Sequence, residues 1–437
     1  MIQRMRPVVS LLFPCALVSL MVLSGCGGQA SLHNIVNPLG GVCTPSSVQP
    51  CAGITPKFLV AVDSGTAGSN VTVFPINSTT GALGAAVVGS PFNMGLTNGF
   101  NLVVHPNGHW VYAPDSNDGS IHAFNVNEIT GVATVIGSVI NESGSFYQPN
   151  GNTDSGTTVL AISPDGQYLY SANNDATVGQ YLISQTSGAL TPIGAGNLNI
   201  GACDTGAIIA SLTNVYVTDT CGSSGPWNVY SMSIGANGAL SSPASVPVTN
   251  VYTWLWSITL SPNGKFLYTG DEGGDAQIFA YSVGTNGALT SIAATNDPAF
   301  FNTNSSAPKA NTLEQFFDPN SSDCRDFAFS PDGKFLYWTD DDEFLHVLTS
   351  DATSGLLDQP NFSPYQSNAA DGQIVVDMTG QFIYFGGGGN GGGVYAYTRD
   401  QTTGAATLIG SSFTATANNN TMGVGIVRER YPSTPTN

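Results

Sequence analysis

Short apolar runs alternate with turns rich in Gly, Pro, Asn and Asp along nearly the whole chain. One unit begins with the run Phe327–Phe329, continues through the turn Ser330–Gly333 and adds a second run, Phe335–Trp338. A third run alternates apolar and polar residues, as in Ile278–Val283, and the turn Thr285–Leu289 leads to a weaker fourth run. Alternation over short runs bounded by Pro and Gly predicts β-strands. Each unit is therefore expected to form four antiparallel strands.

The turn and the strand after it recur as a motif with the consensus S-P-D-G-K-F-L-Y. The copies are Ser330–Tyr337, Ser261–Tyr268, Ser163–Tyr170 and His105–Tyr112, with weaker ones at Ser211–Tyr216 and Asp377–Tyr384. The equivalent tyrosines are 46 to 69 residues apart. Four strands per repeat of this length are typical of a β-propeller blade.

The strand runs can be counted by type, from the channel outwards. Seven second strands are expected: Phe58–Val62, Trp110–Ala113, Tyr168–Ser171, Val215–Thr218, Phe266–Thr269, Phe335–Thr339 and Phe382–Phe385. Six innermost strands precede them, and the seventh is found only at the C-terminal end, Gly423–Val427. The sequence predicts an all-β, seven-bladed propeller of four-stranded antiparallel blades over residues 57–430. The C-terminal strand joins the N-terminal blade and removes the open edges of the ring, and residues 431–437 form a tail.

The first 26 residues have the pattern of an export leader. Arg4 and Arg6 precede an apolar stretch, and Leu23-Ser24-Gly25-Cys26 matches a bacterial lipobox, in which the Cys26 thiol receives lipid. A plain secretory signal or an uncleaved anchor helix are the alternatives. Residues 27–56 are small, polar and interrupted by Gly and Pro, which predicts a flexible tether. The expected product is an exported lipoprotein of the periplasm or outer membrane, attached to the membrane only through its lipid.

Charge narrows the choice of partners. The formal net charge is −19, and removal of the leader makes it more negative by two, because that segment contains two arginines and no acid. Such a chain repels nucleic acid, and no basic patch offsets this. We expect a monomer that binds a small molecule or an envelope protein.

The cysteines suggest disulfides in an exported chain. Cys203 and Cys221 flank the two inner strands of the fourth unit and should lie at the same end of that blade. Cys43 and Cys51 are able to pair across a short loop, which leaves Cys324 over.

Acidic residues follow the second strand of most units, so the repeat places them on one face together with the long loops. The largest group is the run Asp340-Asp341-Asp342-Glu343. Carboxylates gathered there, Asp340, Asp341 and Asp342 in particular, could bind Ca²⁺. The alternative is that Asp and Asn are simply favoured in loops and solvate them.

Arg325 is one of few cations in the chain and enters the innermost strand of the sixth unit, near that acidic run. Its guanidinium could polarise a lactone carbonyl, with Asp326, Asp341 or Glu343 as general base, or it could form a salt bridge.

Tyr252, Trp254 and Trp256 alternate just before the corresponding strand of the fifth unit. They could stack on a sugar ring or pack between blades.

The repeats Phe327–Tyr337, Ile258–Tyr268 and Leu160–Tyr170 resemble the lactonase-family seven-bladed propellers, which include 6-phosphogluconolactonases and overlap with YVTN-type repeat proteins. The resemblance implies a propeller fold and a lactonase-type activity. Family members have P-R-H before the repeat and N-E after it. The matching stretches here are Cys324-Arg325-Asp326 and Asp340-Asp341, so Arg325 is kept and the histidine is replaced.

Two functions follow from these observations. One is a lipid-anchored binding module that uses its acidic, loop-rich face for a ligand or protein. The other is an extracytoplasmic lactone hydrolase that uses Arg325 and a nearby carboxylate.

Overall fold

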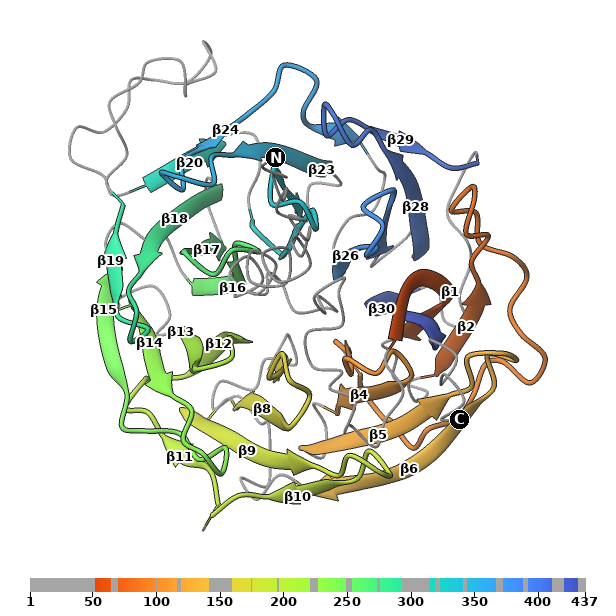
Figure 1. Ribbon diagram of the computed structural model, residues 1–437, viewed down its shortest axis with the longest axis horizontal. Helices are drawn as coiled ribbons and strands as arrows, with labels where there is room; N and C mark the ends of the chain where they lie inside the picture. Colours follow the sequence, from red (N-terminus) through yellow and green to blue (C-terminus); the bar gives the residue numbers. More distant parts are fainter. Residues whose placement is uncertain are drawn as a thin grey trace, which may run out of the picture.

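A computed structural model of the 437-residue chain shows seven antiparallel sheets arranged as blades around a central axis (Figure 1). It describes residues 52–63, 70–99, 101–115, 119–140, 159–173, 175–194, 196–220, 227–248, 254–272, 276–292, 314–318, 323–340, 344–366, 372–387, 392–410 and 420–430. The predicted seven-bladed β-propeller is confirmed. Among the described residues, no helix is long and apolar enough to cross a membrane.

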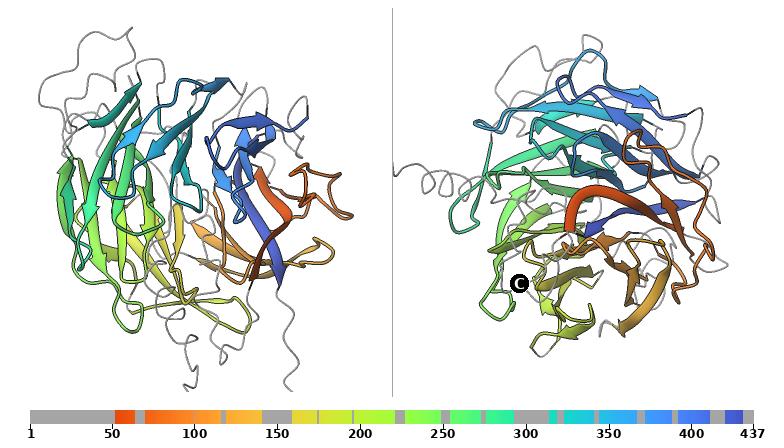
Figure 2. Two further views of the ribbon diagram at one scale, coloured as in Figure 1. Left: turned by 45° about the horizontal axis from the view of Figure 1, so that its top comes forward. Right: turned by 45° about the vertical axis from the view of Figure 1, so that its right-hand side comes forward.

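Blade 1 contains both ends of the described chain. Strand β1 (Ala52–Asp63) lies between β2 (Val71–Pro75) and the C-terminal β30 (Thr421–Arg430). Val60 pairs with Gly425 in the β1–β30 ladder, and isolated bridges such as Val71–Phe92 extend the outer edge of β2. Figure 2 shows β30 and β1 side by side despite their distance in sequence. The predicted closure of the ring by the C-terminal strand is thus confirmed, and β1 starts at Ala52, inside the segment expected to be a tether.

The other six blades follow chain order, with the first strand of each nearest the axis (Figure 1). Blade 2 is β3 (Val103–Val104), β4 (Trp110–Pro114), β5 (Ser120–Val126) and β6 (Ala133–Ile140). Blade 3 is β7 (Val159–Ile162), β8 (Tyr168–Asn173), β9 (Thr177–Ile183) and β10 (Leu190–Pro192), with β11 (Leu198–Asn199) added on β9. Blade 4 is β12 (Thr205–Ala210), β13 (Asn214–Asp219), β14 (Trp227–Ser233) and β15 (Ala244–Val248).

Blades 5 to 7 repeat this order. Blade 5 is β16 (Trp254–Leu260), β17 (Phe266–Glu272), β18 (Ala276–Val283) and β19 (Leu289–Ser291), with β20 (Glu314–Asp318) also on β18. Blade 6 is β21 (Asp326–Phe329), β22 (Phe335–Thr339), β23 (Phe344–Ser350) and β24 (Leu357–Asp358), with β25 (Tyr365–Gln366) on β23. Blade 7 is β26 (Ile374–Val376), β27 (Phe382–Gly387), β28 (Gly393–Arg399) and β29 (Ala406–Leu408).

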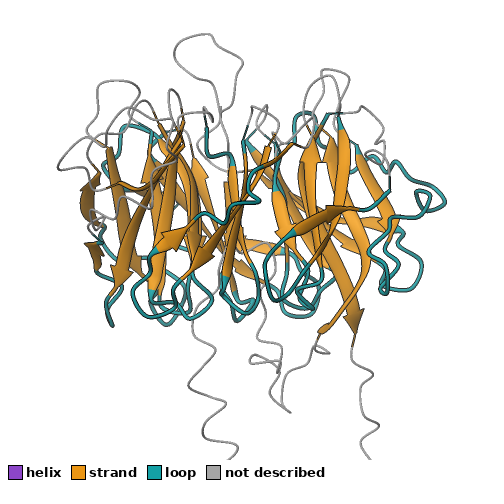
Figure 3. Ribbon diagram, turned by 90° about the horizontal axis from the view of Figure 1, so that it is seen from above, coloured by secondary structure: helices purple, strands orange, loops and turns teal. Residues whose placement is uncertain are grey.

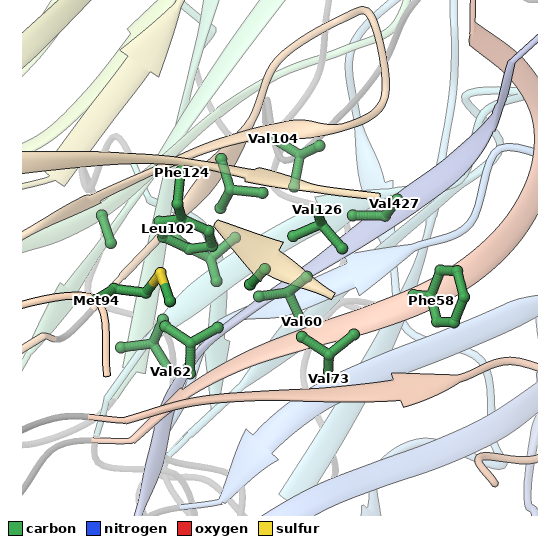
Figure 4. Packing of buried hydrophobic residues seen from close by; sticks show 14 of the residues in the cluster. Phe58, Val60, Val62, Val73, Met94, Leu102, Val104, Phe124, Val126 and Val427 are labelled. Atoms are coloured by element: carbon green, nitrogen blue, oxygen red, sulfur yellow. The ribbon is translucent and has the colours of Figure 1, made fainter. Parts of the chain in front are cut away.

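The core lies between neighbouring blades rather than within any one of them. Residues of blades 1 and 2 form one such layer, in which Phe58 and Val60 of β1 pack with Leu102, Phe124 and other apolar side chains (Figure 4). Similar buried clusters join the other blades. Each blade is a sheet buried on both faces, which explains why its strands are apolar in nearly every position.

The repeat motif lies at one end of the strands. Its Pro-Asp/Asn-Gly turns join the first and second strands of blades 2, 3, 5 and 6. The described loops and turns gather along the lower edge in Figure 3. Ser330 shows why the motif needs its residues: its hydroxyl donates to Asp332 Oδ1 and accepts from the N–H of Phe335, while Gly333 takes φ +71°. The residues of these turns are explained by their structural role. The loops at the opposite end of the blades are therefore the expected place for a ligand-binding or active site.

Candidate functional site

The Asp and Asn residues at the ends of the second strands share one end of the blades, as predicted, and most of the described ones are buried. Exposed fractions are at most 1% for Asp63, Asp115, Asn173, Asp219, Asp271 and Asp340. Each accepts or donates bonds that hold nearby loops. Asp115, for example, accepts from the N–H groups of Thr97 and Asn98. Burial directs the oxygens of these residues to the protein's own donors, whereas Asp175, which follows the second strand of blade 3, is exposed.

Asp340 illustrates this most clearly. Its Oδ2 lies 2.7 Å from Nε2 of His346, and its Oδ1 accepts from the N–H of Phe344 at 2.7 Å. The imidazole of His346 is stacked on the ring of Trp338, with centroids 4.1 Å apart. Asp340 and His346 therefore form a buried pair within blade 6, and neither reaches solvent. Asp341, Asp342 and Glu343 lie outside the described residues.

A metal site is not found in the described part of the chain. No group of three or more His, Cys, Asp or Glu side chains lies close enough there to hold an ion. Asp340, the one described member of the predicted calcium set, has both carboxylate oxygens engaged by His346 and Phe344.

Arg325 forms an ion pair with Asp323, and the predicted partners Asp341 and Glu343 lie outside the described residues. Its Nη2 lies 3.0 Å from Oδ2 of Asp323, which is buried, and the Arg325 side chain as a whole is 21% exposed. The repeat motif alone does not point to Asp323, because this residue stands just outside it, two residues before Arg325. The spacing is nevertheless informative, since alternate residues of an extended segment point to the same side. The ion pair fixes the position of the partly exposed Arg325 side chain.

Asp326 is the first residue of β21 and is partly buried. Its Oδ2 accepts the N–H of Ile374 in blade 7 at 2.9 Å, so it also joins two blades. Burial raises the pKa of the Asp326 carboxyl to about 7, although the N–H groups of Ile374 and Phe327 oppose that rise. A carboxyl with this pKa exchanges protons near neutrality, as a general base must.

The aromatic residues predicted in blade 5 lie close to this segment. Trp254 is 39% exposed, and its ring centroid is 6.2 Å from that of Trp256. Asp271 connects the two parts: it pairs with Leu255 between the tryptophans, and its carbonyl accepts the N–H of Cys324 at 3.0 Å. Trp254 and Trp256 of blade 5 and Asp323, Arg325 and Asp326 of blade 6 thus lie on neighbouring segments, which we name the blade-5/6 mouth. Tyr252 lies outside the described residues.

The cysteine predictions fall mostly outside the described residues, which include neither Cys26, Cys43, Cys51 nor Cys221. Cys203 precedes β12, and its N–H lies 3.4 Å from Oδ1 of Asp219. Both disulfides and the lipidation of Cys26 stay predictions. Cys324 is buried, with its sulfur 3.7 Å from the carbonyl of Gln277.

The fold and the mouth define a seven-bladed β-propeller with an aromatic and charged patch at the loop end of the axis. No family model and no curated protein sequence matches the chain. Solved structures do. A periplasmic gluconolactonase of Pseudomonas aeruginosa superposes with a TM-score of 0.63 at 16% identity, covering 85% of this chain and 99% of that one.

Two further structures are similar to the same extent. A candidate 6-phosphogluconolactonase of Bacteroides uniformis gives a TM-score of 0.62 at 16% identity, covering 85% of this chain and all of its own. A protein of Lactobacillus plantarum gives 0.62 at 17% identity with the same coverage. At these identities the likeness establishes the fold and leaves the activity to be argued from the site.

Proposed function

We propose that this protein is an extracytoplasmic hydrolase of sugar lactones, with its site at the blade-5/6 mouth. The main support is that Arg325, a partly exposed cation held by an ion pair, and Trp254, an exposed indole, lie on segments that meet at Asp271. A sugar ring stacks on an indole face, and a guanidinium binds the oxygen that becomes negative when water attacks a lactone carbonyl. Asp326, with its pKa near 7, is the base that would accept the proton from that water.

The cellular place proposed here follows from the leader and is supported by the similarity to a periplasmic gluconolactonase. A neutral lactone suits the site better than a phosphorylated one. The chain has a net charge of −19, and Arg325 already shares its charge with Asp323. A dianionic phosphate would be repelled at long range.

The test is hydrolysis of a panel of aldonolactones and aliphatic lactones. The rate is measured from the protons that the acid products release. The parent protein is compared with Arg325→Gln, Asp326→Asn and the control Lys334→Gln, which removes an exposed cation from the turn face of the same blade. We expect Arg325→Gln to lose at least about 100-fold in kcat, as loss of one oxyanion donor does elsewhere. The control should keep parental kinetics, and equal turnover in all four proteins would refute the assignment.

A binding module is the second candidate, because the ion pair with Asp323 occupies part of the Arg325 guanidinium. It predicts no turnover on any lactone, together with a saturable change in tryptophan fluorescence that Trp254→Ala abolishes. An envelope protein or a free small molecule is the ligand class proposed for that case, with lipid on Cys26 as the membrane attachment.

A further inference from the structure

Arg428 is a buried cation at the opposite, turn end of the axis. It belongs to β30, the strand that closes the ring, and is only 1% exposed. Its backbone N–H donates to the carbonyl of Gly108 at 3.0 Å, and its Nη2 donates to the carbonyl of Pro106 at 3.1 Å. Arg428 therefore contacts the turn of blade 2 on both sides of Asn107.

Within the described residues, no carboxylate pairs with this guanidinium, and its Nε has no hydrogen-bond partner. Burial lowers the pKa of Arg428 to about 10, so the group stays charged at neutral pH. The neighbouring imidazole of His105 is neutral and does not offset the charge of Arg428. Its Nδ1 accepts from the N–H of Asn107, so the neutral ring donates through Nε2 to the carbonyl of Gly166. A buried guanidinium without a negative partner destabilises the folded state, unless a bound anion balances its charge.

The same molecule shows what a compensated arginine looks like. Arg399 is buried beside the equivalent turn of blade 6, where Asp332 stands at the position that Asn107 holds in blade 2. Its Nη2 lies 3.2 Å from Oδ1 of Asp332, and its Nε and Nη1 donate to Tyr337 and Gly380. Arg428 lacks the counterpart of that carboxylate because its turn has an amide.

The amide of Asn107 is itself half used. Its Oδ1 accepts the N–H groups of His109 and Trp110 at 3.1 and 3.2 Å, which fixes the orientation of the amide. Its Nδ2 is buried and has no partner among the described residues. Two buried donors, Arg428 Nε and Asn107 Nδ2, are therefore left over at one junction, and both require an acceptor.

We propose that this junction of β30 with the turn His105–His109 binds a compact monovalent anion, of the size of chloride or a small carboxylate, through Arg428 and Asn107. The low exposure of both side chains excludes a bulky ligand. Since Arg428 lies on the strand that completes blade 1, a bound anion stabilises the closed ring. The site lies at the turn end of the blades and is independent of the lactone hydrolysis proposed above.

Thermal unfolding tests this directly. Sodium chloride is exchanged for sodium isethionate, whose anion is too large for the site, at constant ionic strength. We expect chloride to raise the Tm of the parent saturably by about 1–3 °C, because a ligand that binds only the folded state stabilises it. Crystals soaked in bromide should show an anomalous peak within hydrogen-bonding distance of Arg428 Nε.

Asn107→Asp is the decisive variant. It keeps the Oδ1 acceptor for the two N–H groups and places a carboxylate beside Arg428, as Asp332 does for Arg399. We expect a higher Tm than the parent in isethionate and no further rise with chloride. Asn263→Asp, at the same turn position in blade 5, is the matched control and should keep the parental chloride response. A parent without a chloride response, or an Asn107→Asp variant with an undiminished one, would overturn the proposal.

Discussion

The hydroxyl of Tyr384 in blade 7 donates a 2.8 Å hydrogen bond to the carbonyl of Gly81 in blade 1, across 303 residues of sequence. The same bond joins four other neighbouring pairs of blades, each at 2.8 Å: Tyr112 to Gly188, Tyr170 to Gly238, Tyr268 to Gly355 and Tyr337 to Gly404. The tyrosine of the repeat motif is thus the donor, and the acceptor is the glycine of the turn that precedes the fourth strand in the neighbouring blade. The pair formed by Tyr384 and Gly81 is the one that spans the closure of the ring.

Replacing Tyr384 with Phe tests the value of that bond. Loss of the hydroxyl leaves the Gly81 carbonyl without its donor, so we expect the free energy of unfolding to fall by about 1–2 kcal/mol. Tyr216→Phe is the control, because Tyr216 holds the same repeat position, while Ser231 makes the bond to Gly287 at that junction. Denaturant unfolding should show a smaller loss for the control, and equal losses would contradict the role given to the bond.

Gly81→Ala should be more damaging than the loss of the hydroxyl. Gly81 has φ +73°, and a Cβ there would lie 2.3 Å from Cδ1 of Phe382 in blade 7. The backbone strain and the clash together should cost about 2–4 kcal/mol. Gly410→Ala separates the two causes, because Gly410 has φ +85° but a Cβ there would meet no heavy atom within 4 Å, and we expect a loss of about 1 kcal/mol. Thermal or urea unfolding of both variants gives the comparison.

These contacts explain which parts of the structure the sequence could predict. The turn residues and the strands are local, so the repeat alone located Phe335–Thr339 and its six counterparts. The position of Gly423–Val427 followed from counting, because a ring must close. The residues that surround Arg325 could not be obtained in this way. Asp323 lies outside the repeat, and the depth at which Asp340 is buried depends on His346 and Trp338 in the folded blade.

Deletion of residues 420–437 should prevent folding. It removes β30, which pairs with β1 from Ala52 to Asp63 and contributes Val424 and Ile426 to the core shared by blades 7 and 1. The remaining chain would expose the edge of β1 and the apolar faces beside it. We expect an aggregated or protease-sensitive product, whereas deletion of residues 431–437 alone should leave the Tm unchanged. A soluble, cooperatively unfolding protein after the longer deletion would show that blade 1 does not need β30.

The carboxyl of Asp326 should make stability depend on pH. Its pKa is raised from 3.8 to about 7 in the folded state, so the folded protein holds this proton more tightly than the unfolded chain. The contribution of Asp326 to stability is therefore fully present below about pH 4 and is lost as the pH rises towards 7. Asp326→Asn keeps an oxygen for the N–H of Ile374 and cannot ionise. Its unfolding free energy should fall less between pH 5 and 7.5 than that of the parent.

Asp204 is a second carboxyl that should make the unfolding free energy depend on pH. Burial also raises the pKa of Asp204 to about 7, so a slope of the same sign should remain in Asp326→Asn and become smaller when Asp204→Asn is added. Asp219 and Asp377, whose pKa values burial also raises, contribute to the part that remains. Lactone turnover should change with pH in the opposite direction to stability, because a general base must be deprotonated. Turnover by the parent should rise as the pH passes 7. Asp204→Asn should keep that activity profile while it alters stability. If the activity profile instead shifts in Asp204→Asn and not in Asp326→Asn, the base is misassigned.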